Sequence, residues 1–129
     1  MTKATQTGPS ESGITDARIL VVEDDSVLCE VLKEVLESRG FSLVTARDGF
    51  EGLRVVFNGN FDVVLCNWHI PVMDGSEFYR DVERLDPELC GRFIFTTGFP
   101  AASVQQFIQQ INGTILLKPF AWSSLLDAV

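Results

Sequence analysis

The sequence predicts an α/β fold in which a five-stranded parallel sheet carries helices on both faces. Short apolar segments of strand length alternate with amphipathic segments of helical spacing. This alternation occurs five times along 129 residues, with a repeat of roughly 20 residues, as expected for successive βα units. The chain is too short, and its helices are too few, for an eight-fold barrel. We therefore expect a (βα)5 doubly wound domain.

The expected strands are short and rich in aliphatic residues, and they cover 18–23, 41–46, 61–67, 92–98 and 114–118. The expected helices have apolar residues three and four positions apart, and they cover 26–40, 49–59, 76–85, 101–111 and 121–129. In the second helix we expect Leu53, Val56 and Phe57 to point inward. The third strand is apolar throughout, as is typical of a central parallel strand.

Composition excludes several classes of partner and site. Residues 1–17 are polar, and we expect a disordered leader before one domain over 18–129. The net charge of −8 disfavours direct binding to nucleic acids or anionic membranes, since both rest on Lys and Arg. The three cysteines, without a Cys-x-x-Cys pair, indicate neither a disulfide framework nor a zinc site. Reduced thiols and the lack of a membrane-length apolar run fit a cytoplasmic protein.

Polar side chains stand where four of the expected strands end, and they are Glu23, Asp24, Asp25, Asn67, Thr97 and Lys118. Because the carboxyl ends of parallel strands meet at one edge of the sheet, we expect these residues to surround one crevice. Adjacent carboxylates can hold a hard cation such as Mg²⁺. A lysine and a hydroxyl, together with the metal, could bind the oxygens of a phosphoryl group. A nucleophile would stand in the middle, where Asn67 stands.

Four motifs in this order resemble the receiver domain of two-component response regulators: ILVVEDD at 19–25, DVVLCNWHIPVMDG at 62–75, FIFTTG at 93–98 and LLKPF at 116–120. The resemblance covers about residues 18–129 and implies the flavodoxin-like strand order 2-1-3-4-5. It implies a domain that accepts a phosphoryl group from a histidine kinase or phosphotransfer protein and is not itself an enzyme. The cofactor it implies is Mg²⁺.

The resemblance also implies a role for each matching position. Asp24 should bind Mg²⁺ directly, Glu23 partly through water, and His69 through its main-chain carbonyl. Thr97 and Lys118 should contact the phosphoryl group. The other structural and switch positions are Asp25, the loop proline Pro71, the turn Asp74-Gly75, the switch position Ile115, and Pro119, which matches a bond that is usually cis in the family.

Two positions depart from the family pattern. The phosphoacceptor is an aspartate four residues before the loop proline, and that position is Asn67 here. A neutral carboxamide is a far poorer nucleophile than a carboxylate, so we expect no phosphorylation, whether the change is natural or engineered. Loss of a carboxylate also predicts weakened Mg²⁺ binding. The family often has Tyr or Phe at the position of Ile115, so an aromatic switch is not expected there.

Other functions stay open at this point. A pseudo-receiver, acting as an interaction module without phosphorylation, is favoured by Asn67 and Ile115. A small phosphohydrolase or a nucleotide or flavin binder is disfavoured, because EDD lacks the DxD spacing and no glycine-rich loop follows the first strand. The family commonly dimerises or docks through its fourth helix, fifth strand and fifth helix, which implies a homodimer through 101–129. Just past a strand end, we expect Trp68 to be exposed and His69 to lie at the rim without a catalytic role.

Overall fold

The computed structural model describes residues 17–129, so nearly all of the predicted leader lies outside the described residues. One sheet of five parallel strands has the order β2-β1-β3-β4-β5, which confirms the predicted fold class and strand order. The strands are β1 (Arg18–Val22), β2 (Ser42–Ala46), β3 (Val63–Asn67), β4 (Phe93–Thr97) and β5 (Thr114–Leu117). The helices are α1 (Ser26–Glu37), α2 (Gly49–Asn58), α3 (Gly75–Leu85), α4 (Pro87–Cys90), α5 (Ala102–Gln110) and α6 (Trp122–Ala128).

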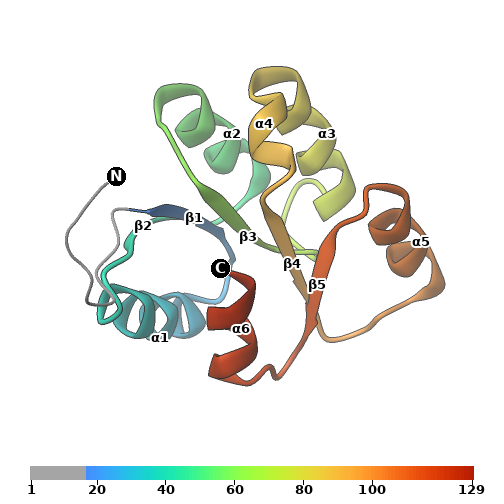
Figure 1. Ribbon diagram of the computed structural model, residues 1–129. Helices are drawn as coiled ribbons and strands as arrows, with labels where there is room; N and C mark the ends of the chain where they lie inside the picture. Colours follow the sequence, from blue (N-terminus) through green and yellow to red (C-terminus); the bar gives the residue numbers. More distant parts are fainter. Residues whose placement is uncertain (1–16) are drawn as a thin grey trace.

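Helices cover both faces of the sheet, with α1 and α6 on one side and α2, α3, α4 and α5 on the other (Figure 1). Successive strand residues point to opposite faces, so each strand contributes to both apolar layers. Below α1 and α6 lie buried side chains that include Ile19, Val21, Leu65 and Ile94. The other layer is richer in rings and includes Phe78, Tyr79, Phe93 and Phe95. Burial on both faces explains why the central strands are apolar at consecutive positions.

Acidic side chains fix the starts of the helices that follow the strand ends. The Asp25 carboxylate accepts hydrogen bonds from the backbone N–H groups of Val27 and Leu28 at the start of α1. Asp74 caps α3 and forms a reciprocal capping box with Glu77. These caps set the short β1–α1 and β3–α3 connections, which in turn set the positions of the residues at the strand ends.

Two details differ from the sequence prediction. Phe57 is 74% exposed, so the prediction that it points inward is wrong. Gly52 and Val56 already occupy the face of α2 that meets the sheet, and a helical step of about 100° carries the next residue out of it. The short helix α4 was not predicted, although Asp86 at its N-cap and Pro87 at its first position are a recognisable start signal. Within residues 17–129, every helix falls short of the length and apolarity needed to cross a bilayer.

Candidate functional site

The carboxyl ends of β1, β3 and β5 bring Glu23, Asn67 and Lys118 together. Val22 pairs with Cys66 in the parallel register, so Glu23 and Asn67 follow at the same height on neighbouring strands. Lys118 directly follows β5 and reaches across the sheet edge to β1. We call Glu23, Asn67, Lys118 and the backbone of His69 the strand-end site.

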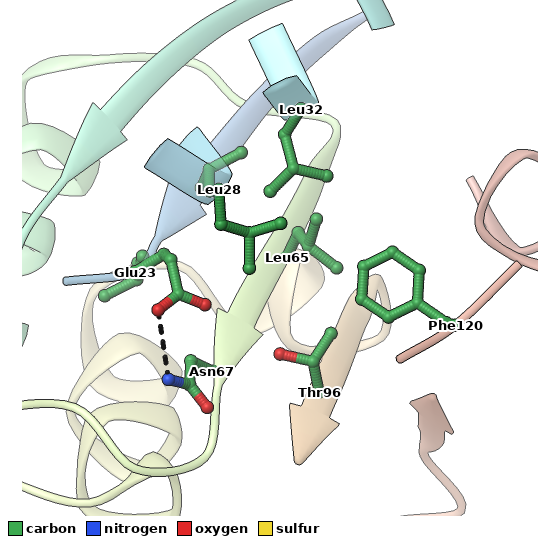
Figure 2. A pocket seen from close by; sticks show the side chains of 9 residues that line it. Glu23, Leu28, Leu32, Leu65, Asn67, Thr96 and Phe120 are labelled. Carbon is green, nitrogen blue, oxygen red and sulfur yellow. Dashed lines mark hydrogen bonds between the residues drawn. The ribbon is translucent and has the colours of Figure 1, made fainter. Parts of the chain in front are cut away.

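The side-chain amide of Asn67 is hydrogen-bonded on both of its polar atoms. Its Nδ2 donates to Glu23 Oε2 at 3.2 Å (Figure 2) and to the carbonyl oxygen of His69 at 3.1 Å. Its Oδ1 accepts from the backbone N–H of His69 at 3.3 Å. Two acceptors on one side and a donor on the other fix which atom is nitrogen. Asn67 therefore ties the end of β1 to the loop that follows β3.

Glu23 is a buried carboxylate that is fully compensated by its neighbours. It is 3% exposed, and its Oε1 lies 2.9 Å from Lys118 Nζ. Its Oε2 accepts from Asn67 and also from the backbone N–H of Asp25 at 3.2 Å. A buried ion pair is tolerated when its remaining lone pairs find donors in this way.

The three acidic side chains after β1 differ in position and in contacts. Glu23 turns inward, Asp25 caps α1, and the Asp24 side chain is exposed. Residues 17–129 contain no group of three or more His, Cys, Asp or Glu side chains arranged to hold a metal ion. The oxygen donors of the site have the chemistry that Mg²⁺ prefers. In this arrangement the Asn67 amide donates hydrogen bonds to two of the predicted ligands, Glu23 and the His69 carbonyl.

The hydroxyl of Thr97 is hydrogen-bonded to the loop that follows β4. Thr97 is fully buried, and its Oγ1 both donates to the carbonyl of Phe99 and accepts from the N–H of Phe99, each at 3.1 Å. Its neighbour Thr96 stands opposite Asn67 in the register and lines the cavity beside Glu23 and Asn67, under the ring of Phe120 (Figure 2). Sequence reasoning missed Thr96; strand alternation from Ile94 places it on the α1 side and could have revealed it.

Trp68 is 7% exposed, so the prediction that it faces solvent is wrong. Alternation continues one residue past β3 and turns its indole toward the ring-rich layer. There it packs edge-on against Phe95 and Phe107, with centroid distances of 5.3 and 5.4 Å. Its carbonyl accepts from the N–H of Gly75 at 2.8 Å, which joins the site to the start of α3.

The predicted switch and loop positions lie around this cluster. Ile115 is partly buried and packs against the same ring-rich layer, without contributing a ring of its own. The Lys118-Pro119 bond is cis, as the family resemblance implied. Pro71 lies in the loop between β3 and α3, where the next residue, Val72, has a left-handed backbone with φ of 78°. His69 is exposed and lies at the rim.

Neither cysteine near the site is a substitute nucleophile. Burial, followed by the nearby Glu23 carboxylate, raises the pKa of the Cys66 thiol above its usual range. The pKa of Cys29 is raised by burial and by the same carboxylate, and its Sγ donates to the carbonyl of Glu23 at 3.5 Å. Both sulfurs therefore remain protonated near neutral pH, and a neutral thiol is not the reactive form.

Comparison with known proteins identifies the family. The response regulator receiver domain family matches residues 19–129. This chain belongs to that family. The receiver domain is 37% identical over 113 residues to the transcriptional regulatory protein GlrR of Escherichia coli K12, a match that covers 88% of this chain and 25% of GlrR. The chain thus spans about a quarter of the length of this relative.

Solved receiver domains share the fold closely. The CheY-like receiver domain protein from Methanospirillum hungatei aligns with a TM-score of 0.81 and 27% identity, over 88% of this chain and 90% of that one. The receiver domain of a sensor histidine kinase from Pseudomonas aeruginosa PAO1 aligns with a TM-score of 0.75 and 25% identity, over 88% of this chain and 93% of that one. The second structure holds a magnesium ion in its active-site cleft. The chain is therefore a receiver domain of the two-component type, with an amide at the centre of its strand-end site.

Proposed function

We propose that this receiver domain does not accept a phosphoryl group and acts as a protein-interaction module whose conformation phosphorylation does not set. The observation that carries the proposal is the state of Asn67. Its nitrogen faces Glu23 and the His69 carbonyl, and its oxygen is held by the His69 N–H. An uncharged amide engaged on both atoms offers no electron pair suited to attack on phosphorus. The domain accordingly has no phosphoryl turnover of its own.

Phosphoryl transfer from acetyl phosphate with Mg²⁺ tests this proposal. We expect no incorporation into the parent protein and incorporation into Asn67→Asp, which restores the carboxylate nucleophile. Asn60→Asp is the matched control, because it makes the same chemical change at an exposed position outside the site. Acid-stable, hydroxylamine-sensitive label in the parent protein would disprove the proposal.

We also propose a partner surface on α5, β5 and α6, where a second copy of the chain would bind. Phe99, Leu117 and Trp122 are exposed there, and only Lys118 and Asp127 carry charge between residues 99 and 129. In a chain with a net charge of −8, this is the face on which two copies repel each other least. Sedimentation of Leu117→Glu tests it: we expect a dimer in the parent protein, a monomer in this variant, and a dimer in the control Phe57→Glu on α2.

The other partners follow from the family. A histidine kinase or phosphotransfer protein is the class of protein that would dock on this domain, in a complex that transfers no phosphoryl group. Direct contact with nucleic acid is not part of the proposal, because the domain is acidic. Three free cysteines support a reducing, cytoplasmic location.

A further inference from the structure

In the strand-end site, the side-chain nitrogen of Asn67 binds two oxygen atoms that the family resemblance assigns to a cation. We infer that the Asn67 carboxamide replaces a divalent cation, so that the site holds its shape without metal. The inference rests on the proposed function in one respect only, namely that residue 67 is not the acceptor. Ion binding is a separate property of the site, which the labelling experiment does not measure.

The amide nitrogen of Asn67 lies between two of the predicted cation ligands. Its two hydrogens point at Glu23 Oε2 and at the His69 carbonyl. Both acceptors lie 3.1 to 3.2 Å from this one nitrogen, so a single donor group bridges them as a metal ion would. To admit Mg²⁺, which requires oxygen ligands at about 2.1 Å, the amide would have to break both bonds. Turning Oδ1 inward would also break its bond from the His69 N–H.

The charges of the site already balance without a cation. The buried carboxylate of Glu23 is paired with the Lys118 ammonium at 2.9 Å, and Asn67 contributes no charge. These three side chains therefore sum to zero, while Asp24 is exposed and solvated. An aspartate at position 67 would add a second negative charge beside Glu23, which a cation would then have to offset. Asn67 thus lowers the electrostatic demand for Mg²⁺, and Asn67→Asp restores it.

Calorimetry on the whole chain tests the inference. Between EDTA and about 10 mM MgCl₂ we expect the Tm of the parent protein to change by less than about 1 °C, because an ion that does not bind the folded state does not stabilise it. Asn67→Asp should melt several degrees lower in EDTA and recover in Mg²⁺, by about 4 °C or more at saturation. Asn60→Asp should behave like the parent protein, which separates the effect of the site from that of added charge.

NMR on the parent protein gives a second measurement that needs no variant. A hydrogen-bonded Asn67 side-chain NH₂ should give a resolved, slowly exchanging pair of resonances that Mn²⁺ does not selectively broaden. Mn²⁺ broadening centred on Asn67 and Glu23, or a Mg²⁺-dependent rise in the parent Tm, would overturn the inference. So would an Asn67→Asp protein that ignores Mg²⁺, because the amide would then not be what excludes the ion. If the parent protein takes no phosphoryl label but binds Mg²⁺, this inference is wrong and the proposed function is unaffected.

Discussion

Lys118 Nζ lies 2.9 Å from the carboxylate of Glu23, which joins β5 to β1 across 95 positions of sequence. The Glu23 side chain is 4% exposed and that of Lys118 is 27% exposed. If the ion pair breaks, water can therefore solvate the Lys118 ammonium but not the buried Glu23 carboxylate.

Removing the lysine should therefore strongly destabilise the fold. We expect Lys118→Met to lower the free energy of unfolding by about 2–3 kcal/mol, because it leaves a buried carboxylate without its counter-charge. Urea unfolding followed by circular dichroism measures the loss. The double variant Glu23→Gln/Lys118→Met should recover part of it; a double variant as unstable as the sum of the two single variants would show that the pair is not coupled.

The neighbouring threonines should respond differently to the same substitution. Thr97→Val removes a hydroxyl that makes two hydrogen bonds to Phe99 and should cost about 1–2 kcal/mol. Thr96 is 3% exposed, its hydroxyl bonds to nothing within residues 17–129, and the cavity beside it is too narrow for water. Thr96→Val should thus be neutral or stabilising by up to about 1 kcal/mol. Equal losses in the two variants, measured by urea unfolding, would contradict this expectation.

Gly75 should be intolerant of a side chain for reasons of packing. A Cβ there would lie 2.9 Å from Trp68 Cε3 and 3.2 Å from its Cα, and neither atom can move freely. We expect Gly75→Ala to cost about 1–3 kcal/mol in unfolding free energy. Gly98→Ala is the control, because no atom lies within 4 Å of the point that its methyl group would occupy. A neutral Gly75→Ala would mean that the Trp68 ring shifts without cost.

Val72 holds a backbone conformation that is unfavourable for a β-branched residue. Its φ is 78°, and its side chain is 67% exposed, so little packing offsets the strain. Val72→Gly should raise the unfolding free energy by about 0.5–1 kcal/mol, the strain relieved less the chain entropy that glycine adds. Asn112→Gly, at a φ of 54°, should change it less, because Asn tolerates this region. A destabilised Val72→Gly variant in thermal unfolding would argue against strain.

The thiol of Cys90 should make the fold sensitive to alkali. Burial, and then the Glu83 carboxylate, raises its pKa from 9.0 to about 11. The unfolded chain loses this proton first, so the contribution is intact below pH 9.0 and is lost as pH rises toward 11. The unfolding free energy should fall by up to about 1.4 kcal/mol per pH unit for this one group. Cys90→Ala should give a shallower fall between those pH values, and an unchanged slope would rule the thiol out.

The sheet could be predicted because its signals are local. Five apolar runs, each followed by a helical pattern, define the strands without knowledge of their partners. The parallel register then brings Glu23, Asn67 and Lys118 to one edge, since each is the last strand residue or the one after it. The predictions for Phe57 and Trp68 were wrong because a shift of one residue along a helix or strand changes whether a side chain faces the core or the solvent.

The contacts within the site could not be predicted from the sequence. The pairing of Lys118 with the buried Glu23 depends on how β1 and β5 are placed in the folded sheet. The direction of the Thr97 hydroxyl depends on the path of the loop through Phe99. Both contacts depend on the folded geometry, and no periodic pattern of residues in the sequence indicates them.

The burial of Trp68 gives the domain two optically distinct indoles. Trp68 is 7% exposed among aromatic rings, whereas Trp122 is 38% exposed at the start of α6. Emission from Trp68 should be blue-shifted and shielded from iodide. Emission from Trp122 should be red-shifted and readily quenched in the monomeric Leu117→Glu variant, where no second copy covers it. A single fluorescence spectrum with a collisional quencher can therefore report separately on the neighbourhood of Asn67 and on the start of α6.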